Sequence, residues 1–547
     1  MKNMLLTAAL CTGLVACEEA PKTETAPYQV SDTALSDHIK TLASDAFGGR
    51  APGTPGEELT VNYITTAFKT AGLKPANGDS YVQSVPLVSI QVKGAPSLTI
   101  AGGKTALNLA FKTDQILWTR KETSSAAIAD SELVFVGYGI NAPERGWNDY
   151  EGIDVKGKTV VILVNDPGYA TQDDALFNGN SMTYYGRWTY KFEEAARQGA
   201  AGALVIHETK PAAYPWTTVE NSWTGPLFDI ARADKGANLL DIEGWLTTEA
   251  TSALFKAAGL DRAALSKAAL SADFKAVSFN LTASAMIETE IQHVTSRNVA
   301  GLIEGSTNPD EYFIYMAHWD HLGTDPTIDG DGIYNGAHDN ATGTAGLIEL
   351  AKQFASGDQP KRSVLFLAVT AEEQGLLGSA YYAANPLVPL VQTVGGINMD
   401  GLNLYGPTND VTVVGHGNSE LDDLLTEAAK SQNRVLVGDH SPEKGYFYRS
   451  DHFELSKLGV PMLYPNPGYD HKEKGRAYVE KIAAYYIAND YHTPSDEFDP
   501  NWDFTGAVED LQLYAKTGRL VINSSLWPNW KDGTEFKTIR DTQRAGK

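Results

Sequence analysis

Cysteine is almost absent from this sequence of 547 residues. Its two cysteines, Cys11 and Cys17, both lie within the first 17 residues. The rest of the chain therefore has no thiol that can form a disulfide or bind a metal ion. Any metal site in the body of the protein must be built from histidine, aspartate and glutamate side chains.

Positive charge and long apolar runs are also scarce. The chain has 44 Lys and Arg residues against 68 Asp and Glu residues, which gives a formal net charge of -24. An acidic surface of this size repels phosphate backbones, so we expect no nucleic-acid partner. No interior run approaches the ~18 apolar residues that a membrane-spanning helix needs. The length itself predicts two or three domains.

The N-terminal residues have the features of an export signal. A positive residue precedes an apolar stretch, Met4 to Ala16, that is too short to span a bilayer. The residues Leu14 to Cys17 resemble the lipobox of bacterial lipoproteins, in which the cysteine is acylated. We therefore expect a lipoprotein signal peptide at 1–17, a flexible tether at 18–30, and a lipid anchor at Cys17. This anchor would hold the exported protein on the periplasmic side of the bacterial cell envelope, at the outer membrane. The alternative is an ordinary signal peptide with an incidental cysteine.

The middle of the chain has a pattern of its own. Apolar runs at 133–136, 158–164 and 203–206 predict buried strands, and glycine-rich turns separate them. The order of these motifs resembles the protease-associated domain, a small β-rich module that is inserted into several peptidases. We therefore expect three parts after the tether: a first peptidase segment at 31–127, an inserted protease-associated domain at 128–280 and a catalytic peptidase segment at 285–547.

The last part of the chain alternates strands and helices, which predicts an α/β fold. We expect a mixed, mostly parallel sheet flanked by helices on both faces, with strands at 312–317, 363–370 and 395–399. Eight of the eleven histidines fall in this part: His318, His321, His338, His416, His440, His452, His471 and His492. Open α/β sheets bind their ligands beyond the carboxyl ends of their strands.

Three of the expected strands end in side chains of the metal-binding type. The first strand is followed by His318 and Asp320, the second by Glu372 and Glu373, and the third by Asp400. Each residue alone has an ordinary explanation, such as a turn or a helix cap. Together they would require several independent accidents at one edge of one sheet, so the sequence predicts a metal site there.

The ordered motifs of this part resemble the co-catalytic zinc exopeptidases, which include bacterial secreted aminopeptidases and glutamate carboxypeptidases. The motifs are Ala317-His318-Trp319-Asp320-His321, Gly336-Ala337-His338-Asp339-Asn340, Thr370-Ala371-Glu372-Glu373-Gln374-Gly375, Asn398-Met399-Asp400 and Tyr491-His492-Thr493-Pro494. The early loop from Gly49 to Gly53 matches the family's N-terminal segment as well.

The resemblance implies a site with two zinc ions. Asp339 would bridge the two ions, with His318 and Asp400 completing one site and Glu373 and His492 the other. Each ion would then have three protein ligands and an open position, as catalytic zinc requires.

The same resemblance implies the catalytic roles. Glu372 would be the general base, which takes a proton from the water that two zinc ions activate and passes it to the leaving amine. Asp320 would orient His318. Tyr491 would donate to the tetrahedral oxyanion, and its alternative role is that of a packing aromatic. The peptide bond after Asp339 would be cis.

These observations favour a di-zinc metallo-exopeptidase that acts on peptides, with an aminopeptidase as the first choice. The acidic net charge favours a substrate with a terminal ammonium group. A carboxypeptidase or dipeptidase of the same family is the main alternative, and it needs an arginine to hold a terminal carboxylate. Arg449 is the best candidate among the four arginines between His318 and His492. A single-zinc glutaminyl cyclase and a non-enzymic binding protein are further alternatives, which the complete ligand set disfavours.

Overall fold

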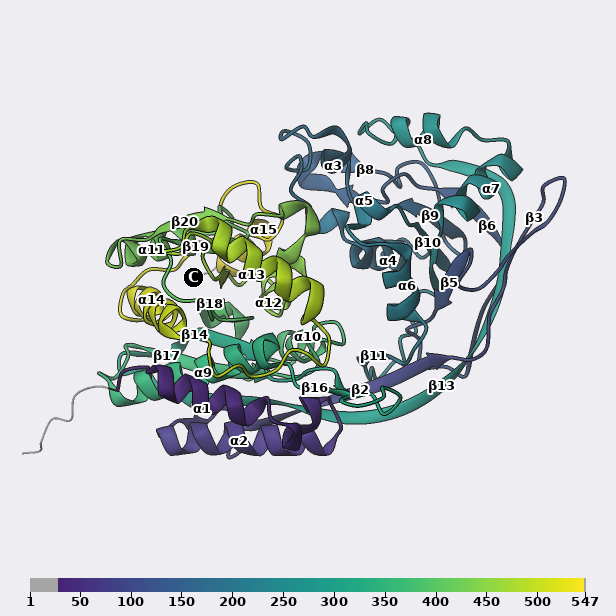
Figure 1. Cartoon of the computed structure of the whole chain (residues 1–547). Helices are drawn as coiled ribbons and strands as arrows, with labels where there is room; N and C mark the ends of the chain where they lie inside the picture. Colours follow the sequence, from purple (N-terminus) through teal and green to yellow (C-terminus); the bar gives the residue numbers. More distant parts are fainter. Residues whose placement is uncertain (1–27, 546–547) are drawn as a thin grey trace, which may run out of the picture.

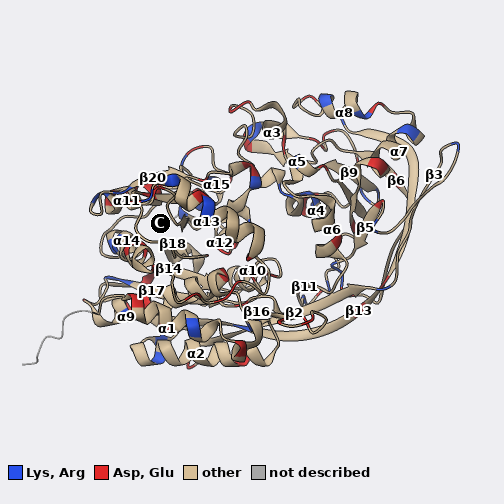
Figure 2. Cartoon of the chain, in the orientation of Figure 1, with Lys and Arg blue, Asp and Glu red and all other residues tan. Residues whose placement is uncertain are grey.

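The computed structural model describes residues 28–545 as two parts that one long strand connects (Figure 1). The expected signal peptide and the anchor residue Cys17 lie outside the described residues, as does most of the expected tether. No helix within 28–545 combines the length and the apolar character that crossing a membrane requires. Charged residues of both signs are spread over both parts (Figure 2).

The first part is built on a mixed sheet whose four central strands are parallel. The strand order is β2 (Val82–Val92), β13 (Val277–Ile303), β17 (Arg362–Val369), β14 (Asn308–His318), β18 (Thr393–Asn398), β21 (Met462–Asn466), β19 (Asp410–Val414) and β20 (Val435–Gly438). The short strands β1 (Lys74–Pro75) and β11 (Leu227–Ile230) pair with β13 and β2. The expected mixed and mostly parallel sheet is therefore confirmed.

Helices cover both faces of this sheet because side chains alternate between the faces along each strand. On β14, Phe313 and Tyr315 point to one core, and Ile314 and Met316 point to the other. The first core contains α1 (Asp32–Leu42), α2 (Pro55–Ala71), α9 (Thr342–Ser356), α11 (Leu421–Lys430) and α14 (Thr505–Ile522). The second core contains α10 (Leu377–Ala384) and α12 (His452–Ser456).

The second part has a sheet of its own. Its strand order is β4 (Leu107–Leu109), β3 (Leu98–Ala101), β13, β6 (Ser125–Phe135), β9 (Thr159–Leu163), β10 (Gly202–Ile206), β12 (Ile242–Leu246) and β5 (Gln115–Trp118). Its helices are α3 (Pro167–Thr171), α4 (Trp188–Arg197), α5 (Thr209–Ala212), α6 (Trp216–Trp223), α7 (Thr248–Ala258) and α8 (Arg262–Ala268). Two small hairpins, β7 (Asn141–Ala142) with β8 (Trp147–Asn148) and β15 (Gly323–Thr324) with β16 (Ile333–Tyr334), lie outside these sheets.

The second sheet extends beyond the range 128–280 that the sequence predicts for the inserted domain. The strands β3, β4 and β5 precede residue 128 but belong to this sheet. Strand β13 crosses the predicted limit at 280, because its first half pairs with β6 and its second half with β2 and β17. A strand belongs to the sheet in which its backbone groups form hydrogen bonds. The amino-acid composition of these short strands does not show which strand each of them pairs with.

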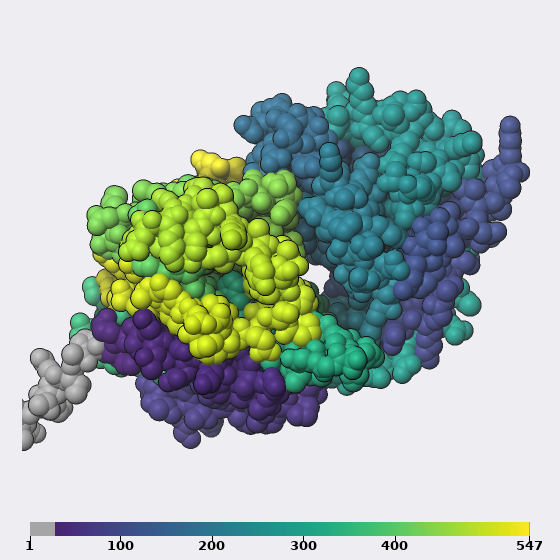
Figure 3. Space-filling view, in the orientation of Figure 1, coloured from purple at the N-terminus to yellow at the C-terminus, as the bar shows by residue number. Residues whose placement is uncertain are grey.

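An aromatic contact docks the second part onto the first. The Tyr184 ring packs edge-on against Phe453, with centroids 5.0 Å apart, and is stacked with Tyr448 at 6.0 Å. The Met182 N–H also donates to the Pro442 carbonyl at 3.1 Å. The space-filling view shows that the surface is hollowed between the two parts (Figure 3).

Arg50, in the predicted N-terminal loop, joins the first segment of the chain to the loops of the sheet. Its side chain is 1% exposed and donates to the carbonyl oxygens of four residues. These acceptors are Trp319, Leu42, Asn335 and Gly336, at 2.6 to 2.8 Å. Arg50 thus fixes the backbone that follows His318 and the backbone that precedes Asp339.

We expect the substitution Arg50→Met to destabilise the first part strongly. Four buried carbonyl groups would lose a charged donor, which costs about 3 kcal/mol or more and lowers the Tm by roughly 5 °C or more. Calorimetry would measure this change, with Lys40→Met, an exposed charge at the end of α1, as the matched control. Equal Tm values for the two variants would contradict the anchoring role of Arg50.

Candidate metal centre

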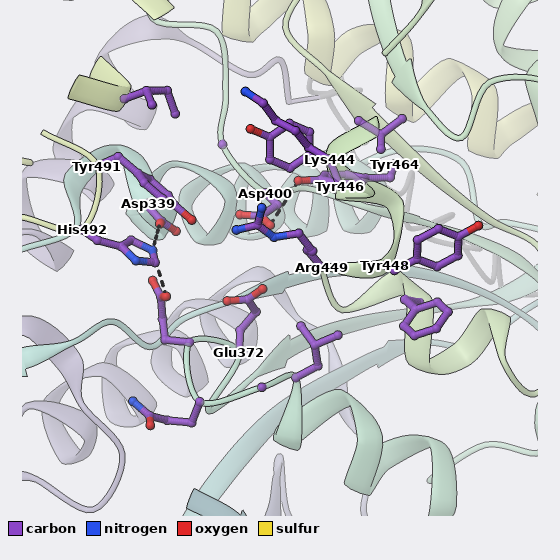
Figure 4. Close-up of a pocket in the computed structure, with 18 of the residues that line it drawn as sticks. Asp339, Glu372, Asp400, Lys444, Tyr446, Tyr448, Arg449, Tyr464, Tyr491 and His492 are labelled. Atoms are coloured by element: carbon purple, nitrogen blue, oxygen red, sulfur yellow. Dashed lines mark hydrogen bonds and ion pairs between the residues drawn. The ribbon is translucent and has the colours of Figure 1, made fainter. Parts of the chain in front are cut away.

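Imidazole and carboxylate groups from separate loops converge beyond the carboxyl ends of the parallel strands (Figure 4). The loops and elements are β14 for His318, the residues after β17 for Glu372 and Glu373, the residues after β18 for Asp400, the turn at 337–341 for Asp339, and the residues after α13 (Arg476–Asn489) for His492. Adjacent parallel strands end at one edge, so residues far apart in sequence become neighbours.

The Asp339 carboxylate lies between two histidines. Its Oδ1 is 3.3 Å from Nε2 of His318, and its Oδ2 is 3.2 Å from Nε2 of His492. His318 Nε2 is also 3.1 Å from Asp400 Oδ1, and His492 Nε2 is 3.0 Å from Glu373 Oε2. The structure therefore brings together all five residues that the resemblance names as ligands, with Asp339 at the centre.

The backbone around Asp339 is held from several sides. Asp496 accepts hydrogen bonds from the N–H groups of His338 and Asp339, at 2.9 and 3.0 Å. The Asn340 amide donates to the Met399 carbonyl at 2.9 Å. The Asp339–Asn340 peptide bond is cis, as the resemblance implies.

The donor atoms form two groups that each suit a metal ion. His318, Glu372 and Asp400 offer atoms within 4.8 Å of one another, and His321, Asp339 and Glu373 do the same. Nitrogen and oxygen donors of this kind are ligands for zinc. Within residues 28–545, none of the four carboxylates forms an ion pair with a lysine or arginine. The cluster thus gathers negative charge that favours a bound cation, and its residues fit zinc.

The electrostatics of the cluster follow from this charge. Burial lowers the pKa of His318, but Glu372 and Asp400 outweigh it and raise the pKa well above its usual value. Burial raises the pKa of Glu372 well above its usual range, while His318 opposes the rise and Asp400 adds to it. Burial and the neighbouring charges therefore both shift the pKa values of His318 and Glu372.

The Asp320 carboxylate is placed differently from its expected position beside His318. Its Oδ1 is 3.8 Å from Nδ1 of His318, which is beyond hydrogen-bond length, and the ring faces the Asp320 carbonyl at 3.2 Å. The carboxylate accepts instead from the N–H groups of Glu372 and Glu373, at 3.1 and 3.4 Å. Burial raises its pKa to about 7. Asp320 thus lies next to His318 and also holds the backbone of Glu372 and Glu373 in position.

Tyr491 packs directly on the site. Its ring is stacked on His492 with centroids 3.8 Å apart, and Figure 4 shows it close to Asp339. Burial raises its pKa well above the usual value, and Asp339 adds to this rise. A second phenol, Tyr464, donates to Asp400 Oδ2 at 3.3 Å. Both hydroxyl groups therefore stay protonated as possible donors.

Three residues of the site were missed as functional residues by sequence reasoning. His321 is fully buried, with Nδ1 2.6 Å from Glu373 Oε1. Ser450 donates to Asp400 Oδ2 at 2.7 Å. The third, Asp496, holds the turn before α9. His321 lies within the motif from Ala317 to His321, and Ser450 follows the candidate Arg449. Both positions were usable signals, whereas nothing in the sequence marks Asp496.

The cluster opens into a cavity of about 3370 Å³ that both parts of the chain line. The lining includes Trp118, Arg187 and Tyr214 from the second part and Glu372, Asp400 and Arg449 from the first. The second part therefore lines one side of the cavity that the candidate metal centre faces.

Comparison with known proteins gives partial matches. The "Probable zinc metalloprotease" of Pyrenophora tritici-repentis (strain Pt-1C-BFP) is 36% identical over 255 residues, which are 45% of this chain and 55% of that protein. "Aminopeptidase NAALADL1" of Mus musculus is 30% identical over 150 residues, 26% of this chain and 18% of that protein. The chain thus spans about half or less of the length of these curated relatives. The solved "Aminopeptidase from Aneurinibacillus sp. strain AM-1" has a TM-score of 0.48 and 20% identity, with 90% of this chain and 95% of that chain covered.

The match to a protein family covers the part of the chain that builds the site. Residues 298–516 match the description of Peptidase family M28, and this range contains every residue of the cluster. Over residues 298–516, the chain is therefore similar to Peptidase family M28.

Proposed function

We propose that this protein is a zinc exopeptidase with two metal ions, and that it removes N-terminal residues from peptides. One observation carries the proposal: the two oxygens of the Asp339 carboxylate face different histidines, His318 and His492, at 3.3 and 3.2 Å. A carboxylate in this position can bridge two ions. Asp400 would complete the site of His318, and Glu373 would complete the site of His492.

The residues around these ligands support the same arrangement. His321 contacts Glu373, and Ser450 and Tyr464 donate to Asp400. Partners of this kind orient ligating carboxylates and tune their basicity. Three protein ligands for each ion would leave a coordination position for water or substrate, as a catalytic zinc site requires, and the cluster lines the cavity.

The proposed reaction is hydrolysis of a peptide bond. When bound, zinc polarises the scissile carbonyl and lowers the pKa of the attacking water. The Glu372 carboxylate accepts a proton from this water and passes it to the leaving nitrogen. Asp320 fixes the backbone N–H groups of Glu372 and Glu373, so that one glutamate serves as a ligand and the other as the base. Tyr491 donates a hydrogen bond to the oxygen on which negative charge develops.

The charge of the site is the basis for proposing that the enzyme acts on the N-terminal end of its substrate. Carboxylates dominate the surroundings of the cluster, and the whole chain carries a net charge of -24. These charges favour a terminal ammonium group over a terminal carboxylate at the metal centre. The relative named as an aminopeptidase supports the same choice. The completeness of both donor groups speaks against a single-zinc cyclase and a non-enzymic binding protein.

We also propose that the protein is exported and anchored by acylated Cys17 to the bacterial cell envelope, with its peptidase part in the periplasm. The support is the lipobox-like run from Leu14 to Cys17, followed by a segment rich in Glu, Thr, Pro and Ala. The proposed inserted domain would be of the protease-associated type and would cover the cavity.

The substitution Glu372→Gln should keep both zinc ions and lose most of the activity. It removes the proton carrier without changing a proposed ligand, and loss of a positioned general base slows turnover by about 10²- to 10⁴-fold. Zinc analysis and peptidase rates would measure the two effects. Asp339→Ala is the contrasting variant, which should lose both metals together. Near-normal turnover of Glu372→Gln would show that another group is the base.

Peptides that are blocked at one end test whether the enzyme acts from the N-terminus or from the C-terminus of its substrate. We expect a dipeptide with a free amine to be cleaved faster than its N-acetylated twin, because the acetyl group removes the ammonium charge. Initial rates with and without a chelator would measure the preference. Faster cleavage of the acetylated peptide would favour a carboxypeptidase instead.

Cell fractionation tests the anchor. The wild-type protein should sediment with membranes and carry a lipid on Cys17, whereas Cys17→Ser should not be acylated and should leave the membrane fraction. Mass spectrometry of the N-terminal peptide would identify the lipid. Unmodified wild-type protein in the soluble fraction would indicate an ordinary signal peptide.

A further inference from the structure

Helix α13 carries an apolar surface that the other described residues leave uncovered. Within this helix of 14 residues, only Val479 is buried. The Tyr485 side chain is 62% exposed, and the Ile487 side chain is 57% exposed. Large apolar side chains gathered at one exposed place are informative, because such patches often mark a site at which a ligand binds.

One face of α13 presents its apolar side chains to the cavity. Tyr478, Ile482 and Tyr485 follow one another at spacings of four and three residues, which places them on one face of a helix. All three line the cavity. The next residue, Tyr486, packs edge-on against the His338 ring, with centroids 4.5 Å apart. The apolar face of α13 therefore starts beside the candidate metal centre.

Tryptophans of the second part line the same cavity. Trp188, at the start of α4, and Trp223, at the end of α6, are both partly exposed. Their rings meet edge to face with centroids 5.0 Å apart, and Trp223 also packs on the buried Trp118 ring at 5.6 Å. Leu227 and Phe228 extend this apolar lining. The packing fixes the indole rings before a ligand binds, and aromatic rings offer large apolar contact areas.

The cavity that these two surfaces line is far larger than one amino acid requires. Its volume of about 3370 Å³ exceeds the ~300–1,000 Å³ that is usual for a pocket that binds a small molecule. In the proposed reaction, one residue of the substrate lies on the N-terminal side of the scissile bond, so the other residues must extend into this space. An extended chain is thin enough to enter a concave space, whereas a folded protein or a flat bilayer is not. The structure therefore favours a peptide as the occupant.

We propose that the residues after the scissile bond bind between α13 and the tryptophans of the second part. The inference rests on the proposed aminopeptidase function and extends it to a substrate class. Substrates would be peptides of several residues, with large apolar side chains beyond the second position. The second part of the chain would then supply specificity, because it contributes Trp188 and Trp223.

Three amide-capped peptides test this preference with the zinc-loaded wild-type enzyme. We expect Leu-Gly-Phe-Phe-amide to be cleaved after leucine with a kcat/KM about 10-fold or more above that of Leu-Gly-Ser-Ser-amide, because burial of one phenylalanine side chain is worth about that factor in binding. Leu-Gly-amide is the short reference. Equal kcat/KM values for the two longer peptides would overturn the inference, even if both exceed the value for Leu-Gly-amide.

Leu-Gly-amide also separates this inference from the proposed function, because it has no residue beyond the second position. Cleavage of Leu-Gly-amide, together with equal kcat/KM values for the two longer peptides, would overturn the apolar binding site alone. Failure of the zinc-loaded enzyme to cleave any of the three peptides would overturn the proposed function itself.

Variants at the two surfaces assign the preference to them. Tyr485→Gln, at an exposed side chain, and Trp223→Leu, at a partly buried one, should each lower the ratio of the two kcat/KM values toward 1. Met286→Gln is the matched control, because Met286 is also 62% exposed but lies on β13, outside the described residues that line the cavity. The ratio should stay at the wild-type value in this control.

Thermal unfolding would verify that each variant is folded, and Tyr485→Gln alone decides if Trp223→Leu does not fold. An unchanged ratio in a folded variant of either surface would contradict binding between the two surfaces. An equal loss in Met286→Gln would contradict a specific site.

A membrane surface is the alternative occupant of an exposed apolar helix. We expect the Cys17→Ser protein, which lacks the proposed anchor, to stay in the supernatant when vesicles of phosphatidylethanolamine and phosphatidylglycerol are sedimented. Binding of this protein to the vesicles, with loss of the binding in a Cys17→Ser protein that also carries Tyr485→Gln, would assign the helix to the membrane and overturn the inference.

Discussion

The negative charge that gathers around Asp339 is the constraint on which the site depends. Four carboxylates lie among three imidazoles, and no lysine or arginine of residues 28–545 is paired with any of these carboxylates. Such a cluster is unfavourable in a buried place unless cations occupy it. In the proposed function two zinc ions would offset this charge, and Asp339, which lies between His318 and His492, would link their sites.

The rest of the fold holds these charges at fixed positions. Asp496 binds the backbone of Asp339, and Asp320 binds the backbone of the two neighbouring glutamates. Arg50 ties the loops on both sides of the cluster to the first segment of the chain. The second part then lines one side of the cavity with residues that include Trp188 and Trp223. The cluster and the cavity that it faces are thus built from different parts of the chain.

The sequence predicts the sheet of the first part and the residues that meet at its edge, for physical reasons. Buried parallel strands are continuous apolar runs, and candidate ligands such as His318 and Asp400 stand at or just after the ends of these strands. The limits of the inserted domain were harder to predict, because β3 to β5 are short and only their pairing shows which sheet they join. The contribution of Trp188 and Trp223 to the cavity was not predicted at all, since these residues reach it through the docking of two parts, and docking leaves no local pattern in the sequence.

Zinc stoichiometry tests the central claim most directly. The full-length protein would be stripped of metal, titrated with Zn²⁺, and analysed for bound zinc per chain and for peptidase rate at each step. We expect two zinc ions per chain at saturation, with full activity restored only when both sites are filled. Saturation at one zinc ion per chain with full activity would contradict a bridged two-metal centre.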